Sequence, residues 1–271
     1  MTDGGEFVFI GGAPRSGTTL LRAIIGACSE IACGPELRVI PALCQLRDNI
    51  SRASGASLAA GYGVSAAHLD RQAAAAISSF LGPLRQRTGA ARAAEKTPTN
   101  ALHFPALRRF FPKAYIISIV RDGRDVVSSL MEMDWRDERT GERLPVTTCP
   151  RMAANLWAAS VANDYEMRGD ERFYSLHYER LVRDPAREIG ALFEFLEAPT
   201  PNLALFHHQT FDVLEGENEF SAARVAEPID TSSIGRWRND LNYADIANVE
   251  AAADPWLERY GYVCPRRRAR S

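Results

Sequence analysis

A glycine segment with clustered hydroxyl groups is the most chemically suggestive part of the chain. Residues 12–19 have the sequence Gly-Ala-Pro-Arg-Ser-Gly-Thr-Thr, after an apolar run and before a helical pattern. Backbone N–H groups at the start of a helix attract anions, and glycine allows a ligand to approach them closely. The hydroxyls of Ser16, Thr18 and Thr19 can donate hydrogen bonds to phosphate oxygens, and Arg15 can offer a guanidinium. The segment predicts an anion site more strongly than a plain glycine turn with a helix cap.

The glycine spacing matches a phosphate-binding P-loop, but Thr18 stands where such loops usually have lysine. A kinase uses that lysine and Mg²⁺ to neutralise a triphosphate. A sulfuryl group carries less charge than a phosphoryl group, so side-chain cations could suffice for its transfer. Arg121 precedes Asp122 after the second apolar run, where a cation would oppose a metal and suit a terminal phosphate. We therefore expect no metal site.

Lysine is scarce in this chain. Two of its 32 basic residues, Lys96 and Lys113, are lysines, and the others are arginines. A compositional bias toward arginine explains most of this ratio. An ammonium group differs from a guanidinium in shape and hydration, so a lysine kept against this background is a candidate for chemistry that needs a compact charge.

Three short apolar runs mark the elements that must position these side chains. They span residues 7–10, 115–120 and 173–176, and they are typical of strands buried in a parallel sheet. Apolar residues recur at helical spacing after each of the first two runs. Asp122 and Asp184 are suited to cap the helices that follow them.

The remaining segments complete an α/β pattern. We expect a helix over residues 151–168 and helices lying over the sheet within the Ala- and Ser-rich residues 51–95. Residues 134–150 are predicted to form a loop, and residues 209–235 an ordered loop. The alternation of strands and helices predicts an α/β fold, a three-layer P-loop-type domain with a central parallel sheet flanked by helices.

Length and composition fit one globular domain over residues 1–271, with a core at 6–263 and a frayed basic tail at 266–271. The net charge of −2 gives no global basic field, so no nucleic-acid partner is expected. The five cysteines are scattered, the first residues are unlike a signal peptide, and no apolar run reaches about 18 residues. These features predict a cytoplasmic protein with no membrane contact.

Two segments together resemble the motifs of sulfotransferases that use 3′-phosphoadenosine 5′-phosphosulfate (PAPS). Residues 14–20, PRSGTTL, are similar to the family's 5′-phosphosulfate loop, and residues 120–129, VRDGRDVVSS, to its 3′-phosphate site. Residues 33–41, residues 177–179 and the surroundings of Trp237 resemble the protein-tyrosine sulfotransferase branch most.

This resemblance, which spans residues 6–263, implies a nucleotide site. PAPS would be a dissociable co-substrate, its desulfated form (PAP) the product, and no metal would be needed. The implied nucleotide-binding residues are Arg15, Ser16, Gly17, Thr18, Thr19, Arg121, Ser129, Tyr178 and Arg236. On residue type alone, Ser129 could equally be a plain helix serine and Tyr178 a core aromatic residue.

The resemblance also implies catalytic groups. The implied catalytic residues are Glu36, Lys96, Arg15 and Ser221, and the implied substrate-binding residue is Arg38. In-line displacement needs a base for the acceptor proton and a cation at the leaving oxygen, which suits Glu36 and Lys96 respectively. On residue type alone, Glu36 would be assigned to a weak rim salt bridge with Arg38. Lys96 could be a helix-cap residue, but the scarcity of lysine argues against this. The matching surroundings favour catalysis.

The departures from the family pattern concern the acceptor more than the donor. Pro35 replaces an acid beside the implied base, and Ala94 stands where the secretory enzymes have a cysteine partner for the position of Cys33. Residues 134–150 do not match the family. The family implies tyrosine in a peptide as the first choice of acceptor, a small-molecule phenol or alcohol as the alternative, and a homodimer as an option.

Two further classes of protein stay open. A P-loop kinase acting on a small molecule would bind ATP and depend on a metal, which the missing loop lysine disfavours. A non-catalytic nucleotide-binding or scaffolding protein would tolerate the loss of Glu36 and Lys96. His103 and His177 are expected to be structural.

Overall fold

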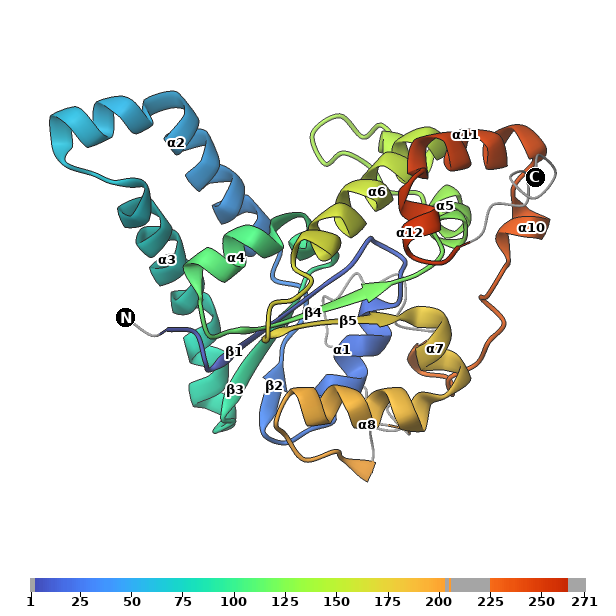
Figure 1. Ribbon diagram of the computed structural model, residues 1–271, viewed down its shortest axis with the longest axis horizontal. Coiled ribbons are helices and arrows are strands. Elements are labelled where there is room, and N and C mark those ends of the chain that lie inside the picture. Colours follow the sequence, from blue (N-terminus) through green and yellow to red (C-terminus); the bar gives the residue numbers. More distant parts are fainter. Residues whose placement is uncertain (1–2, 203–204, 206–224, 263–271) are drawn as a thin grey trace.

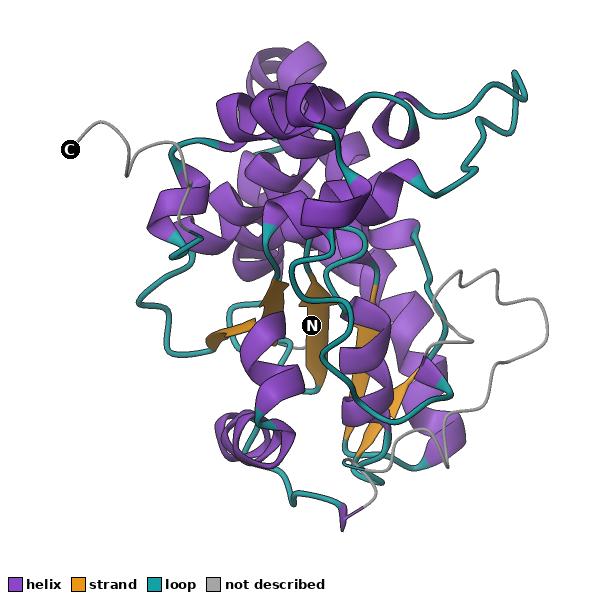
Figure 2. Ribbon diagram, turned by 90° about the vertical axis from the view of Figure 1, so that its right-hand side faces the viewer, coloured by secondary structure: helices purple, strands orange, loops and turns teal. Residues whose placement is uncertain are grey.

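A parallel sheet forms the centre of the computed structural model, which describes residues 3–202, 205 and 225–262. The strand order is β2-β3-β1-β4-β5, and every neighbouring pair is parallel (Figure 1). The strands are β1 (Phe7–Gly11), β2 (Ile31–Cys33), β3 (Arg92–Lys96), β4 (Tyr115–Val120) and β5 (Phe173–His177). Helices lie on both sides of the strands (Figure 2), which confirms the predicted α/β architecture.

The first strand shows why the apolar runs were informative. Phe7 and Phe9 belong to the core cluster on one face of the sheet, and Val8 and Ile10 belong to the cluster on the other face. Successive side chains of a strand face opposite sides, so a strand covered on both faces must be apolar throughout. Every residue of β1 and β4 is accordingly buried.

Three groups of helices cover the sheet and its carboxyl end. The helices α1 (Thr18–Gly26), α7 (Tyr178–Arg183) and α8 (Pro185–Phe195) pack with Val8 and Ile10. The other face carries α3 (Ala66–Thr88) and α4 (Phe104–Phe110). A third cluster lies among α5 (Gly123–Met131), α6 (Pro150–Glu166), α10 (Trp237–Asp240), α11 (Tyr243–Ala253) and α12 (Trp256–Arg259). Two short 3₁₀ helices are η1 (Pro98–His103) and η2 (Pro145–Thr147).

The predicted helix caps are confirmed. The Asp122 side chain accepts a hydrogen bond from the backbone N–H of Arg124 at the start of α5 (2.9 Å). The Asp184 side chain accepts one from the N–H of Arg187 at the start of α8 (3.4 Å). Each carboxylate satisfies an otherwise unpaired N–H at a helix N-terminus. The predicted helix over residues 151–168 corresponds to α6.

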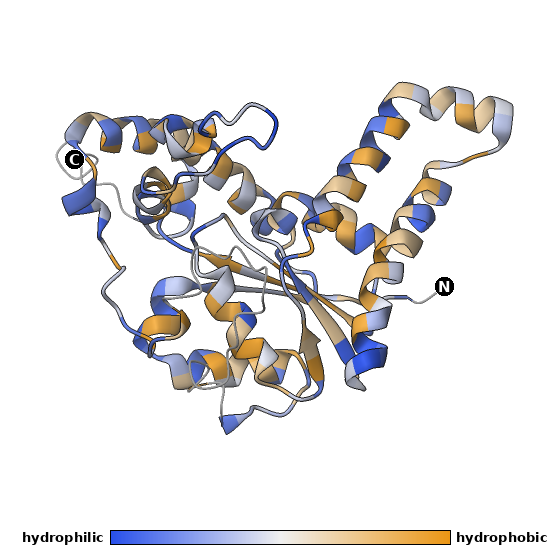
Figure 3. Cartoon of the chain, turned by 180° about the vertical axis from the view of Figure 1, so that it is seen from behind, coloured by the Kyte–Doolittle hydropathy of each residue, from blue (hydrophilic) through white to orange (hydrophobic). Residues whose placement is uncertain are grey.

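A helical arm, formed by α2 (Val39–Tyr62) with the amino-terminal half of α3, projects from the body (Figure 1). Gly63 ends α2 with a left-handed φ of 65°, and the Ser65 side chain caps α3. Figure 3 shows polar and apolar residues mixed along the arm, and most residues of its distal part are exposed. The expectation that residues 51–95 lie over the sheet is therefore wrong for residues 51–62, because α2 joins the core only near its start, through Ile40 and Cys44. The expectation holds for α3, which packs into the same core through Ala73, Ile77 and Leu81. None of the described helices has the length and apolarity needed to cross a bilayer.

The expectation of helix is also wrong for β3. The segment Arg-Ala-Ala-Glu-Lys contains no β-branched or aromatic residue, so its local pattern does not indicate a strand. Pairing decides its conformation, because it lies between β1 and β2 with Glu95 opposite Phe9 and Ala94 opposite Cys33. Cys33 is a free thiol here.

Candidate active site

The phosphate-binding loop, residues 12–19, joins β1 to α1 and needs its glycines for two reasons. Gly17 has a φ of 101°, which disfavours any side chain, and a Cβ atom there would lie 2.7 Å from the Tyr178 ring. A Cβ atom at Gly12 would lie 2.5 Å from the carbonyl oxygen of Ile119. The loop therefore packs closely against β4 and α7, and its last residues begin α1.

Two buried polar groups next to this loop have no hydrogen-bond partner within the described part of the chain. They are the hydroxyl of Ser16 and the Nε of Arg121. Leaving a buried donor unpaired is costly, whereas a bound anion would accept from both groups. The N-terminus of α1 adds backbone N–H groups at the same place. This chemistry fits an anion such as a phosphate or sulfate ester.

Arg121, which follows β4, contacts the loop directly. Its Nη1 donates to the backbone carbonyl of Arg15 (3.0 Å) and its Nη2 to that of Ser233 (2.5 Å). Its guanidinium lies 4.8 Å from the centre of the Tyr178 ring. The Arg15 Nε in turn donates to the hydroxyl of Ser129 on α5 (3.0 Å). Burial, and next the nearby charge of Arg121, lower the pKa of Arg15.

A cavity of about 280 Å³, here called the loop cavity, opens between these groups. Its polar lining includes Arg15, Thr18, Thr19, Arg121, Ser129 and Arg236, and its less polar lining includes Leu20, Tyr178, Val182 and Ile229. The structure thus brings together most of the residues that the sequence assigned to a nucleotide. Cationic groups and an aromatic face in one cavity suit a molecule that combines phosphates with a flat base.

Glu36 and Lys96 lie close together although 60 residues separate them. Lys96 ends β3 with a fully buried side chain, and its Nζ lies 2.5 Å from Glu36 Oε1 and 3.4 Å from Thr19 Oγ1. Glu36 also lies 3.4 Å from the Nε of Arg38, whose side chain is 66% exposed. The pair with Lys96 is therefore the closer and more buried of the two.

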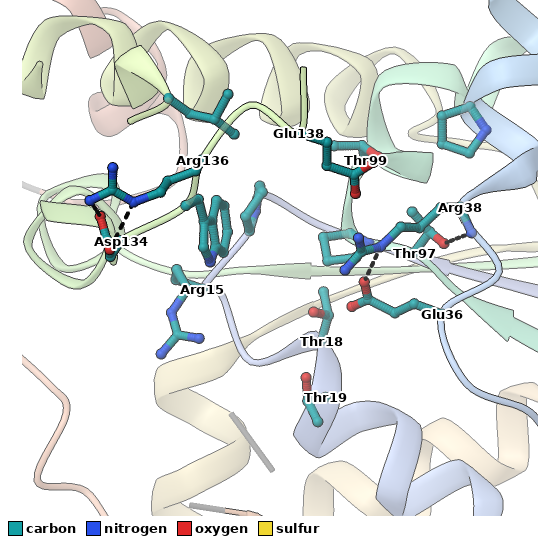
Figure 4. Close-up of a pocket in the computed structure, with 15 residues that line it drawn as sticks. Arg15, Thr18, Thr19, Glu36, Arg38, Thr97, Thr99, Asp134, Arg136 and Glu138 are labelled. Atoms are coloured by element: carbon teal, nitrogen blue, oxygen red, sulfur yellow. Dashed lines mark hydrogen bonds and ion pairs between the residues drawn. The ribbon is translucent and has the colours of Figure 1, made fainter. Parts of the chain in front are cut away.

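A second cavity of about 460 Å³, here called the cleft, contains Glu36 and Arg38 (Figure 4). Its wall shares Arg15, Thr18 and Thr19 with the loop cavity. The cleft and the loop cavity therefore meet at the phosphate-binding loop. A group held on that loop would face Glu36.

The far wall of the cleft is a hairpin, residues 134–144, where the sequence predicted a loop. An antiparallel bridge joins Arg136 to Arg143, and the Asp134 carboxylate contacts both guanidinium groups (3.0 and 3.2 Å). Trp135 and Leu144, from the two ends of the hairpin, line the cleft. The sequence analysis missed these residues, and a lone tryptophan in a polar segment was the available signal.

The other predicted residues are placed as follows. Arg236 lines the loop cavity while its Nε donates to Asp240 (2.6 Å) and its Nη2 contacts Glu132. Ser221, most of the predicted loop 209–235 and the tail 266–271 lie outside the described residues.

The two histidines that the sequence analysis expected to be structural are not part of either cavity. Neither His103 nor His177 lines the cleft or the loop cavity. Burial lowers the pKa of His177 to about 4, with further contributions from Arg180 and Arg168. The His177 Nδ1 lies 3.2 Å from the hydroxyl of Tyr262. Among the residues that the structure describes, no group of acidic, histidine or cysteine side chains could hold a metal.

A parallel sheet with an anion-binding loop, a nearby arginine and an adjacent acid–lysine pair defines an α/β group-transfer enzyme. Comparison with known proteins identifies the family within this class. The model of the sulfotransferase family matches residues 8–202, so the chain belongs to the sulfotransferase family. The protein is accordingly a sulfotransferase enzyme.

Curated relatives lie in the protein-tyrosine branch. The chain is 30% identical to protein-tyrosine sulfotransferase A of Caenorhabditis elegans over 264 residues, covering 94% of this chain and 67% of that protein. It is 30% identical to human protein-tyrosine sulfotransferase 1 over 262 residues, covering 94% and 69% of the two chains.

Solved structures share the fold at lower identity. The sulfotransferase domain of the Synechococcus PCC 7002 olefin synthase superimposes with a TM-score of 0.67 at 22% identity, over 98% of both chains. Mouse sulfotransferase SULT7A1, solved in complex with PAP, superimposes with a TM-score of 0.57 at 16% identity, over 94% of this chain and 84% of its own.

Proposed function

We propose that this enzyme moves the sulfuryl group of PAPS to an acceptor hydroxyl, with the phenol of a tyrosine as the favoured acceptor. One observation carries the proposal. The loop cavity and the cleft meet at Arg15, Thr18 and Thr19, with the Glu36–Lys96 pair on the cleft side. A donor held on the loop and an acceptor held in the cleft would meet there.

The loop cavity supplies contacts for the two ends of the donor. The hydroxyls of residues 16–19 and the N-terminus of α1 would hold the 5′-phosphosulfate. Arg121 and Ser129 would hold the 3′-phosphate, because both line the loop cavity and contact Arg15, through its backbone carbonyl and its Nε respectively. Tyr178 would lie against the nucleotide. Arg236 and Ser221 are proposed to approach the phosphates from the late part of the chain.

The reaction would be a displacement at sulfur. The acceptor oxygen forms a bond to sulfur, the bond from sulfur to the bridging phosphate oxygen breaks, and PAP leaves with that oxygen. Glu36 would take the acceptor proton, and Lys96 would stabilise the charge on the leaving oxygen. A carboxylate is a weak base toward a hydroxyl group, so Glu36 would accept the proton late, when bonding to sulfur has made the attacking oxygen acidic.

The shape of the cleft supports a phenolic acceptor. Pro14, Pro41, Pro98, Trp135 and Leu144 give it flat or apolar walls beside Glu36. An aromatic ring would bury apolar area against these walls while its hydroxyl pointed at the carboxylate. The relatives named as protein-tyrosine sulfotransferases support the same acceptor.

Sulfate transfer from labelled PAPS in the presence of EDTA tests this function. The acceptors would be tyrosine peptides, matched peptides with phenylalanine in place of tyrosine, and small phenols and alcohols. We expect label on tyrosine peptides and none on the phenylalanine controls. Transfer only to small phenols or alcohols would show that the acceptor is a small molecule and not a tyrosine in a peptide. Metal-dependent phosphorylation from ATP without any sulfate transfer would contradict the proposal.

A further inference from the structure

The residue before Lys96 has a buried carboxylate with an unusual set of partners. Glu95 is 2% exposed and ends β3 together with Lys96. Its Oε1 accepts hydrogen bonds from the Thr97 hydroxyl (2.6 Å) and from the backbone N–H of Leu37 (3.2 Å). Its Oε2 accepts one from the Asn100 side chain (2.6 Å). The carboxylate therefore connects the strand of Lys96 to the segment of Glu36.

Thr97 continues the same connection. Its hydroxyl oxygen accepts from the backbone N–H of Arg38 (3.2 Å) while donating to Glu95. The two N–H groups that follow Glu36 are thus held by the two residues that flank Lys96. The strand that precedes this segment ends at Cys33 and α2 begins at Val39, so neither element holds residues 34–38.

This segment needs to be held. Arg38 has a φ of 54°, in the left-handed region that a residue with a side chain adopts at a cost. The surface pair between Glu36 and Arg38 is too exposed to fix the carboxylate, because such pairs contribute little.

Burial of a carboxylate is itself unfavourable, and desolvation accordingly raises the pKa of Glu95 above its ordinary value. The protein could fill this position with an apolar residue at lower cost. The carboxylate instead accepts from donors on three different residues, which fixes a geometry that an apolar side chain could not fix.

We propose that Glu95, acting with Thr97, is a positioning residue that sets the distance between Glu36 and Lys96. The inference rests on the proposed sulfuryl transfer, in which these two groups act on the acceptor and on the leaving oxygen. Glu95 lines neither cavity, so its effect reaches the reaction only through the backbone of residues 37–38 and through β3. A displacement of about 1 Å in a reacting group can reduce a rate about 100-fold.

Three substitutions separate positioning from general stability. Glu95→Ala removes both acceptor oxygens. Glu95→Gln keeps one acceptor for Leu37 and Thr97, because only the side facing Asn100 changes from acceptor to donor. Thr97→Val keeps the shape of a residue that also lines the cleft, but removes both the acceptor for Arg38 and the donor to Glu95. Asp164→Ala is the matched control, since Asp164 is a buried carboxylate that lines neither cavity.

We expect Glu95→Ala to lower kcat about 100-fold and Thr97→Val about 10-fold, with the Kd for PAP unchanged within about threefold. Glu95→Gln should restore most of the kcat, and Asp164→Ala should lower Tm without this loss. A kcat near wild type in both Glu95→Ala and Thr97→Val would overturn the proposal. Equal losses of kcat and PAP affinity would also overturn it, because they would indicate distortion of the whole site.

A crystal structure of Thr97→Val provides a readout besides activity and serves if Glu95→Ala does not fold. We expect the distance between Glu36 Oε1 and Lys96 Nζ to increase. An unchanged distance together with a reduced kcat would overturn positioning. A wild-type enzyme that transfers no sulfate would refute the proposed function, and the crystallographic distance would still decide whether Glu95 and Thr97 position Glu36.

Discussion

At the residue scale, Lys96 is a charged side chain with no exposed surface. A buried ammonium needs acceptors, and Glu36 Oε1 and Thr19 Oγ1 lie within 2.5 and 3.4 Å of its Nζ. These three side chains come from β3, from the segment before α2 and from α1. The charge of the lysine therefore ties the acceptor side of the site to the donor side.

Removing the two charges one at a time should separate their roles. We expect Lys96→Met and Glu36→Gln each to reduce kcat at least about 100-fold, because each would remove a group that acts in the transition state. The Kd for PAP, measured by calorimetry, should change little in Glu36→Gln, since Glu36 does not line the loop cavity. It should rise in Lys96→Met, because the oxygen that Lys96 would contact leaves as part of PAP. Wild-type turnover in both variants would instead indicate a non-catalytic role for the pair.

The sequence pattern placed the residues proposed to bind the donor more directly than it placed Glu36 and Lys96. Residues 12–19 and Arg121 follow apolar runs directly, so their meeting at one edge of a parallel sheet followed from the pattern. Glu36 and Lys96 were identified through family resemblance, because residue type alone favoured a rim pair with Arg38. Their proximity depends on the pairing of β2 with β3, and the local sequence of neither segment predicts a strand.

At the element scale, the hairpin of residues 134–144 forms one wall of the cleft. Arg143 Nη2 anchors its base by donating to the carbonyl oxygens of Met133 (2.6 Å) and Thr147 (3.2 Å). These hydrogen bonds hold the hairpin in place, and the hairpin carries Trp135 at the wall of the cleft.

We expect Trp135→Ala to raise the KM for a phenolic acceptor about 10-fold while leaving the Kd for PAP unchanged, because an aromatic contact contributes about 1 kcal/mol beyond its buried area. Initial rates at varied acceptor concentration check this. Tyr62→Ala, at the exposed end of α2, is the control and should have no effect. An unchanged KM would mean that the acceptor does not contact the hairpin.

The end of β5 predicts a pH effect on stability. The pKa of His177 is lowered to about 4 by burial first and then by Arg180 and Arg168, whereas the unfolded chain protonates this histidine near its ordinary pKa of about 6.5. Between these values the unfolded state binds the extra proton, so this residue makes the protein lose stability as pH falls from about 6.5 to 4. His177→Gln should lose less stability over that range in denaturant titrations. If the free energy of unfolding falls equally with pH in the wild-type protein and in His177→Gln, the prediction is contradicted.

Several elements were predictable and two were not. Covered strands such as β4 are apolar apart from single residues such as Ser118, and Asp122 precedes its helix with a side chain that can cap it. In contrast, β2 has only three residues and β3 has the composition of a helix. The arm was predicted as helix, but sequence periodicity does not say whether a helix lies over the sheet or projects from it.

At the scale of the whole molecule, nucleotide binding should stabilise the fold without metal. PAP would satisfy the buried donors of Ser16 and Arg121 and connect the loop, α5 and the segment around Ser233. At 100 times its Kd, a ligand that binds only the folded state adds about 2.7 kcal/mol to the free energy of unfolding. We expect a rise in Tm with PAP in EDTA by calorimetry. A larger rise with ATP and Mg²⁺ would favour a kinase.

The helical arm has a practical consequence. Its first helix has 24 residues and bends along its length (Figure 1), and the turn at residues 63–65 lies at the end opposite Arg38, where the helix begins. Few side chains at this turn are covered by the rest of the molecule. A fluorophore or an immobilising linker attached there would leave the entrance for both substrates unobstructed. The arm is therefore a suitable attachment point for immobilising the enzyme on a surface during turnover.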